Sequence, residues 1–273
     1  MAEPPPLAGA AWLGWGKPVI DILVTLAAWT YYTAGYVIFF APAYLAAAQL
    51  SRDPETAFQR CNHRFYRVFF RLLRVITPGL AIEIGDEVRA IRGSVIVSNH
   101  VSYLDPILLI SLYPRQKTIV KPVFFRVPIF GRVLRQSGYI SPLLEDAADP
   151  AMIRQIERLG SYLDQGGNLF VFPEGTRARN GRILPFSRGA FKIARRCNAP
   201  MQVVFIRNTD RLFRPGRFRF ITCVPNTVRV SLIGTIDPRQ APSVTALMDQ
   251  VRALMEAECG KEAPAGAPSF STP

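Results

Sequence analysis

The sequence predicts an α/β fold, with a mixed sheet flanked by helices and an N-terminal membrane-anchoring helical segment. Two observations carry this prediction. Strand-like segments alternate with helix-like segments from residue 80 onward, and residues 22–51 form an uncharged, largely apolar run. We expect four parts: a tail at 1–18, an anchoring helix or hairpin plus a basic amphipathic helix at 19–76, an α/β catalytic domain at 77–259, and a disordered tail at 260–273.

The apolar run is too long for an ordinary buried helix. As one helix, its 30 residues would extend about 45 Å, against a hydrocarbon core of about 30 Å. We expect Pro42 to break or kink it, because proline lacks the backbone donor that a helix interior needs. Two structures fit: a tilted transmembrane helix that ends near Pro42, or a hairpin that dips into one leaflet. A cleaved signal peptide fits poorly, because only Lys17 supplies basic charge before the run.

Residues 54–76 have the pattern of a basic amphipathic helix. Apolar residues recur at helical spacing, and five arginines lie between them: Phe58, Cys61, Phe65, Phe69 and Leu72, with Arg60, Arg64, Arg67, Arg71 and Arg74. Beside an apolar anchor, this pattern favours an anionic membrane surface over a merely solvated helix face. It also explains the net charge of +13 better than nucleic-acid binding does. Positive charge after the anchor predicts a membrane protein whose domain lies on the cytoplasmic face of the inner (plasma) membrane.

The elements of the α/β domain follow from short apolar runs, glycines and prolines. The Asp149-Pro150 pair predicts the start of a helix that ends near Gly166. We expect further helices at 106–112 and 186–196, and strands at 80–84, 94–98, 118–120, 168–172, 202–207, 218–224 and 228–233. The last two strands are candidates for pairing with each other.

Composition excludes several classes of site. The four cysteines show no CxxC spacing and lie near no histidine in a zinc-like arrangement, so no metal site is predicted. The sequence also lacks a GxGxxG fingerprint and a GxxxxGK[ST] loop. Neither a nicotinamide enzyme nor a P-loop enzyme is therefore indicated.

A histidine and an aspartate follow the strand at 94–98. His100 lies just beyond that strand, and Asp105 precedes Pro106, which favours a helix N-cap role for the aspartate. A tight loop would let the carboxylate hold one imidazole nitrogen and leave the other free as a base. The alternative is a structural histidine beside an unrelated N-cap aspartate. The other histidine, His63, is expected at the surface of the basic helix.

A second segment decides between these alternatives. Phe172-Pro173-Glu174-Gly175-Thr176-Arg177 follows the strand at 168–172. With Asn99-His100 and Asp105, it closely resembles the glycerophospholipid acyltransferase family, whose best-known branch is the 1-acyl-glycerol-3-phosphate (lysophosphatidic acid) acyltransferases. Two weaker motifs agree: Lys121 to Gly131 resembles the family's second motif, and 199–204 resembles its fourth, with Val203 in place of a usual proline.

The resemblance implies an enzyme that moves a fatty-acyl group from acyl-CoA or acyl-carrier protein to a lysophospholipid hydroxyl, with no bound cofactor. In this family the histidine is the base, which assigns His100 and Asp105 to catalysis. The substrate-binding residues would be Glu174, Gly175, Thr176, Arg177 and Lys121. The family often has an arginine four residues after the isoleucine that corresponds to Ile140, but Leu144 stands there. Another lysolipid acceptor therefore stays open, as does a non-catalytic lipid-binding protein.

Overall fold

A six-stranded mixed sheet organises the computed structural model, which describes residues 13–141, 150–178, 182–214 and 216–261. The strands run in the order β1-β6-β5-β2-β4-β3. β5 and β6 are antiparallel and the other neighbouring pairs are parallel. This confirms the predicted mixed sheet, whose strands are β1 (Leu80–Ile84), β2 (Val95–Ser98), β3 (Gln116–Thr118), β4 (Asn168–Val171), β5 (Met201–Arg207) and β6 (Asn226–Ile236).

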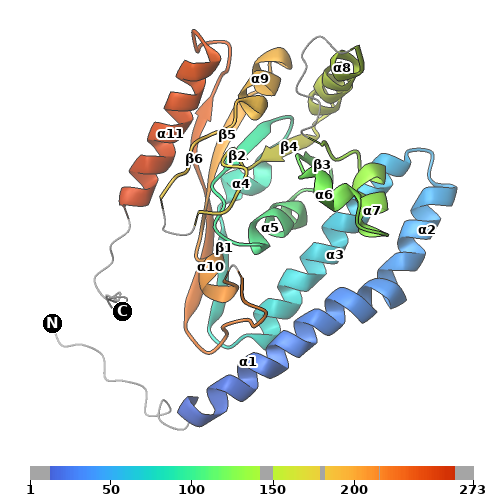
Figure 1. Ribbon diagram of the computed structural model, residues 1–273, viewed down its shortest axis with the longest axis vertical. Helices are drawn as coiled ribbons and strands as arrows, with labels where there is room; N and C mark the ends of the chain where they lie inside the picture. Colours follow the sequence, from blue (N-terminus) through green and yellow to red (C-terminus); the bar gives the residue numbers. More distant parts are fainter. Residues whose placement is uncertain (1–12, 142–149, 179–181, 215, 262–273) are drawn as a thin grey trace.

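Helices cover both faces of the sheet (Figure 1). The pleat of β2 shows the two layers: Ile96 packs in the core shared with α3 and α5, whereas Val95 and Val97 pack on the opposite side with α8, α9 and α11. The helices of the domain are α4 (Asp86–Ala90), α5 (Leu104–Leu112), α6 (Pro122–Phe125), α7 (Phe130–Gln136), α8 (Pro150–Asp164), α9 (Gly189–Arg196), α10 (Thr209–Leu212) and α11 (Val244–Gly260).

The N-terminal segment is a helical rod that turns back into a second long helix. The rod comprises α1 (Leu13–Thr30), the π-helical η1 (Tyr31–Phe40) and α2 (Ala41–Leu50), and α3 (Pro54–Ile76) returns beside it (Figure 1). Of the break or kink expected at Pro42, the break does not occur, because residues 16–50 form one helix. Pro42 lies in the first turn of α2, where its missing donor costs little, and the wider π turns before it make room for its ring.

The rod packs on the domain along its length. Thr222 donates a hydrogen bond to Asp21, Trp29 stacks on Phe218 with ring centroids 5.1 Å apart, and Tyr31 stacks on Phe65 at 5.0 Å. Its outer face exposes large apolar side chains: Val19, Ile22, Leu23, Leu26, Val37, Ile38, Phe39, Leu45 and Leu50. Residues 16–50 form one helix that is long and apolar enough to cross a membrane, with only 22% of its most apolar stretch buried.

The amphipathic pattern of α3 is confirmed, with its apolar stripe turned toward the rod and α5. Phe58, Phe65 and Phe69 are buried, and all five arginines named above are exposed. His63 corrects the expectation of a surface residue. It is half-buried, its Nδ1 lies 3.2 Å from the carbonyl oxygen of Ile110, and burial lowers the pKa of its imidazole.

Two predicted strands need correction. Residues 218–224 form no strand, because the rod takes their backbone donors: Thr25 Oγ1 accepts from the Phe220 amide and Asp21 accepts from the Thr222 amide. β6 therefore pairs with β1 and β5, and not with this segment. The expected strand at 118–120 lies at Gln116–Thr118. Asp149 and the tail beyond residue 261 lie outside the described residues.

Candidate active site

The site begins where β2 ends, at a loop tied to the neighbouring strand. The Asn99 side chain donates to the Ile206 carbonyl at 2.9 Å and accepts from the Ile206 amide at 2.8 Å. This pair of bonds fixes the loop to the end of β5. It places His100 at the carboxyl edge of the parallel strands, where α/β sheets commonly hold their ligands.

His100 and Asp105 form the expected pair. His100 Nδ1 lies 2.9 Å from Asp105 Oδ2, and the aspartate is fully buried. Since a carboxylate is an acceptor, Nδ1 carries the proton and Nε2 is left as the basic nitrogen. Among the described residues no hydrogen-bond partner occupies Nε2, and His100 lines a cavity.

The predicted N-cap role of Asp105 is wrong in detail. Tyr103 is the N-cap of α5, and Asp105 lies within the first helical turn. Its Oδ2 nevertheless accepts from the amides of Val101 and Ser102, at 2.7 Å each. The Asp105 carboxylate thus binds amides of the loop that precedes α5, although Asp105 itself belongs to the helix. Pro106 is tolerated next to it because amides in the first turn of a helix have no partner within the helix.

A further donor, which the sequence did not reveal, completes the environment of the aspartate. Thr209, at the start of α10, donates its hydroxyl proton to Asp105 Oδ1. The two residues are 104 positions apart, so no local pattern could connect them. On the other side, the His100 ring stacks on Phe172, with centroids 4.4 Å apart. The imidazole is therefore held by a hydrogen bond at one edge and by an aromatic ring on one face.

The Phe-Pro-Glu-Gly-Thr-Arg segment packs against the histidine loop. Glu174 accepts from the His100 amide at 3.2 Å and from the Leu184 amide at 2.9 Å, and the Ala178 amide donates to the His100 carbonyl at 2.8 Å. Burial raises the pKa of the Glu174 carboxyl, and the two amides act in the opposite direction. Glu174 therefore holds the histidine loop in place.

Residues 175–177 complete the Phe-Pro-Glu-Gly-Thr-Arg segment. Gly175 has φ +63° and open space where a Cβ would stand, and Thr176 is exposed. The Arg177 guanidinium carbon lies 3.4 Å from the centroid of the Tyr103 ring. Its Nη1 is buried without a hydrogen-bond partner. An unpaired buried donor is rare in proteins, and a planar guanidinium suits a phosphate or carboxylate.

A cavity of about 950 Å³ extends from His100 between β3, β4, α8 and α9. Its wall is mainly apolar, with Ile119, Ile140, Ile156, Leu159, Val171 and Ile193. Basic residues also line it: Lys121, Arg188, Lys192, Arg195 and Arg196. Lys121 is exposed at the start of α6 and lines the same cavity as His100. An apolar cavity of this size accommodates a long hydrocarbon chain.

Several motif positions lie outside this cavity, including Glu174, Thr176 and Arg177. The fourth motif starts β5, where Met201 and Val203 are buried in the core. Leu144, at the position of the family's extra arginine, lies outside the described residues. No group of three or more metal-ligating side chains occurs in the part of the chain that the structure describes.

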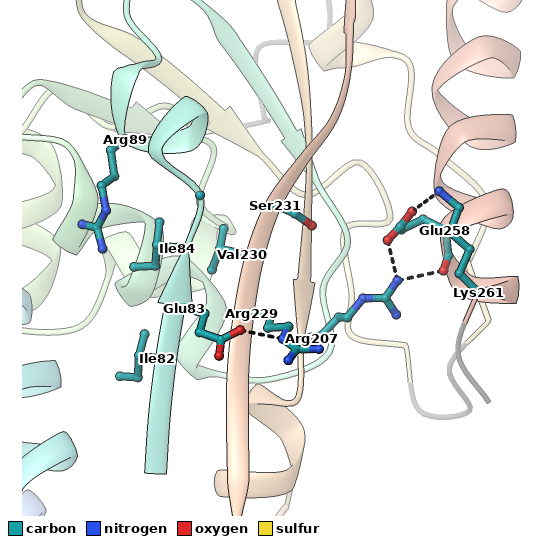
Figure 2. A pocket seen from close by; sticks show the side chains of 11 residues that line it. Ile82, Glu83, Ile84, Arg89, Arg207, Arg229, Val230, Ser231, Glu258 and Lys261 are labelled. Carbon is teal, nitrogen blue, oxygen red and sulfur yellow. Dashed lines mark hydrogen bonds and ion pairs between the residues drawn. The ribbon is translucent and has the colours of Figure 1, made fainter. Parts of the chain in front are cut away.

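Figure 2 shows a second, more open cavity of about 750 Å³ at the β1–β6 edge. Its charged side chains largely pair with each other. Glu83 accepts from Arg229 at 2.7 Å, and Glu258 accepts from Arg207 at 2.6 Å and lies 2.9 Å from Lys261. No histidine, cysteine or aspartate lines it. It lacks the base that the His100 cavity contains.

The fold and the His100 cavity define a class of protein. Among the described residues no serine or cysteine side chain is bonded to His100, so an imidazole held by a buried carboxylate in this way can activate a nucleophile that a substrate brings. Together with the apolar cavity, this arrangement is chemically suited to group transfer on an apolar substrate.

Comparison with known proteins shows what the chain is similar to. Residues 80–207 match the family described as Acyltransferase. The chain is 35% identical over 123 residues to the 1-acyl-sn-glycerol-3-phosphate acyltransferase BAT2 of Brassica napus, covering 45% of this chain and 35% of that protein. It is 32% identical over 120 residues to the 1-acyl-sn-glycerol-3-phosphate acyltransferase of Helicobacter pylori, covering 43% and 50%.

The fold has a solved counterpart. The crystal structure of the 1-acyl-sn-glycerophosphate acyltransferase PlsC from Thermotoga maritima superposes with a TM-score of 0.67 at 23% identity, covering 89% of this chain and 97% of that one. This likeness establishes the shared fold. The curated relatives match over a shorter region, and the chain spans about a third to a half of their length.

Proposed function

We propose that this protein is an O-acyltransferase that moves a fatty-acyl group to the free hydroxyl of 1-acyl-glycerol-3-phosphate, giving phosphatidic acid. The observation that carries the proposal is the His100–Asp105 pair, whose histidine lines an apolar cavity together with Gly175 of the Phe-Pro-Glu-Gly-Thr-Arg segment. Arg177 of the same segment has a buried donor without a partner. The names of the relatives support the same substrate. The donor is a thioester of coenzyme A or acyl-carrier protein, and no bound cofactor is required.

The geometry suggests the order of events. His100 Nε2 takes the proton of the acceptor hydroxyl as the hydroxyl oxygen attacks the thioester carbonyl. The carbon–sulfur bond then breaks, and the imidazolium returns the proton to the leaving thiolate. Asp105 stabilises the imidazolium through Nδ1, and Glu174 fixes the loop that carries it. Arg177 binds the acceptor phosphate, with Lys121 as a second cation at the cavity.

The membrane interaction follows from the rod. Its contacts with the domain extend from Asp21 to Ala47, while its outer face is apolar. A helix held along a folded domain over this length cannot leave it to span a bilayer. We therefore propose that the rod lies in one leaflet, with α3 contributing its arginines to anionic headgroups at the cytoplasmic face.

A second acceptor class remains a specific alternative. A phosphomonoester favours several cations, and Leu144 replaces the arginine that the family often has there. A lysophospholipid with a larger headgroup, or a lyso-aminolipid, would need less charge. A non-catalytic lipid-binding role is less consistent with the site, because both His100 and Asp105 are present and correctly paired.

The test is acyl transfer by the purified protein, with a panel of lysolipids and both donor types. We expect phosphatidic acid to form, and His100→Ala to lower the rate by about 10²–10⁴-fold, the usual contribution of a general base. His63→Ala is the matched control, because His63 contacts α5 and lies outside the cavity. Near-normal activity of His100→Ala would refute the mechanism, and a product other than phosphatidic acid would reassign the acceptor.

A further inference from the structure

The short segment 123–130, in α6 and the turn before α7, exposes an unusual amount of apolar surface. Five of its eight residues are large, apolar and exposed: Val123, Phe124, Val127, Ile129 and Phe130. We call this segment the apolar tip. Scattered apolar side chains are normal on a protein surface, but a contiguous group of this kind marks an interaction site.

The backbone holds one of these side chains outward at a cost. Ile129 has φ 63° and ψ −60°, and the Phe130 amide donates to the Pro128 carbonyl at 2.6 Å, which is the rarer, strained kind of γ-turn. A β-branched residue is unfavourable at positive φ, where glycine is the usual choice. Ile129 is nevertheless 68% exposed, so burial within the domain does not compensate for the strain.

The tight turn is built into the packing of the two helices. A Cβ at Gly131 would lie 2.2 Å from the Phe125 carbonyl oxygen, so only glycine allows α6 and α7 to approach this closely. Arg135 adds a hydrogen bond of 2.6 Å from its Nη1 to the same carbonyl. The tip is therefore a fixed feature of the fold.

The tip lies between the active-site cavity and the N-terminal rod. Lys121 and Phe124 line the cavity, and Val133 of α7 packs against the cluster of Tyr44 and Phe58. Figure 1 shows α6 and α7 next to the end of α2. The exposed apolar residues at that end include Leu50, which is 82% exposed, so the apolar face of the rod continues toward the tip.

The charges around the tip specify the partner. Arg126, Arg132 and Arg135 are exposed and flank the apolar side chains, with Lys121 at the cavity entrance. Among the described residues no acidic side chain pairs with these four cations. Apolar side chains bordered by unpaired cations fit the boundary between acyl chains and anionic headgroups.

We propose that the apolar tip inserts into the anionic leaflet contacted by the rod and opens the active-site cavity onto that leaflet. A single-chain lipid acceptor then enters the cavity directly from the lipid, without crossing water. The entry route rests on the proposed function, whereas the insertion of the tip does not.

Insertion is measured on the full chain without any assay of activity. Ile129→Cys is introduced with the four native cysteines changed to serine, and the thiol carries an environment-sensitive fluorophore. With vesicles of phosphatidylglycerol and phosphatidylcholine, we expect a blue shift and quenching by lipids brominated in the acyl chain. The control label at Gln250→Cys lies on exposed α11 and should show neither. A label at 129 that behaves like the one at 250 would overturn the proposal.

The entry route is tested with a variant that keeps the fold. Ile129→Gly removes the side chain while placing the residue best suited to positive φ, so the melting temperature should not fall. We expect transfer to an acceptor embedded in vesicles to fall roughly fivefold or more, given the apolar surface lost from the lipid. Transfer to a short-chain acceptor dissolved in water should stay within twofold. Equal losses on both acceptors would refute lateral entry, whereas wild-type inactivity on both would refute the proposed function and leave the fluorescence result standing.

Discussion

Thr209→Val tests the hydrogen bond that supports Asp105 from the far side. Three donors reach Oδ2 of this fully buried carboxylate, but Thr209 is the donor that the structure places on Oδ1. Valine keeps the shape of threonine, so the change leaves a buried charged oxygen unpaired without creating a cavity. Losing a hydrogen bond to a charged group costs about 1.5–3 kcal/mol. At about 2–4 °C per kcal/mol, the melting temperature should fall by roughly 3–12 °C.

The effect on catalysis separates this bond from an ordinary buried one. Asp105 orients His100, so we expect kcat to fall about tenfold with little change in the KM of the acceptor. Thr209→Ser keeps the hydroxyl and should retain most of the activity. Thr222→Val is the matched control: its hydroxyl also donates to a carboxylate, that of Asp21, but far from the cavity, so stability should fall while kcat is kept. If Thr209→Val behaves like Thr222→Val, the proposed support of the pair is wrong.

Three other variants or measurements probe the remaining features. Arg177→Ala removes a charge-assisted bond to the acceptor, so it should raise the acceptor KM about 10–150-fold and leave the donor KM nearly unchanged. Steady-state kinetics with each substrate varied in turn measures both values. An equal loss on both substrates would mean that Arg177 binds the donor instead. Tyr103→Leu should raise the acceptor KM roughly three- to tenfold by releasing the Arg177 stack, whereas Tyr103→Phe should stay within twofold. Burial raises the pKa of the Cys197 thiol to about 11 from 9.0. Alkylation at pH 8, followed by mass spectrometry, should therefore label Cys197 about 100 times more slowly than an ordinary thiol. Similar labelling rates would contradict its buried setting.

The His100–Asp105 pair could be predicted because its two residues are close in sequence and follow a parallel strand. His100 follows β2, and the Glu174 segment follows β4, which is the neighbour of β2 in the sheet. The carboxyl ends of adjacent parallel strands meet at one edge, so the two motifs had to converge. Thr209 could not be found this way, since its contact with Asp105 depends on how α10 packs against α5. The Tyr103–Arg177 stack likewise depends on packing between two loops.

The wrong strand at 218–224 has a clear physical cause, which is the contact between the rod and the domain. Read alone, residues 218–224 resemble a strand, but Asp21 and Thr25 of the rod take the amides of Thr222 and Phe220. Hydropathy measures how apolar the rod is, but it does not show that aromatic side chains of α3 cover one face of the rod.

The contact between the rod and the domain gives the rod a structural role. A transmembrane helix could be removed and leave the domain intact, as a simple tether would. Here the rod covers Phe65 and Tyr66 of α3 and supplies hydrogen-bond acceptors to 220–222, so it is part of the folded domain as well as its apolar outer surface. The same rod packs on α7 through Val133 and thereby sets the position of the apolar tip beside the cavity. The orientation that we propose for the cavity relative to lipid would therefore be fixed by the core of the protein, without a flexible linker.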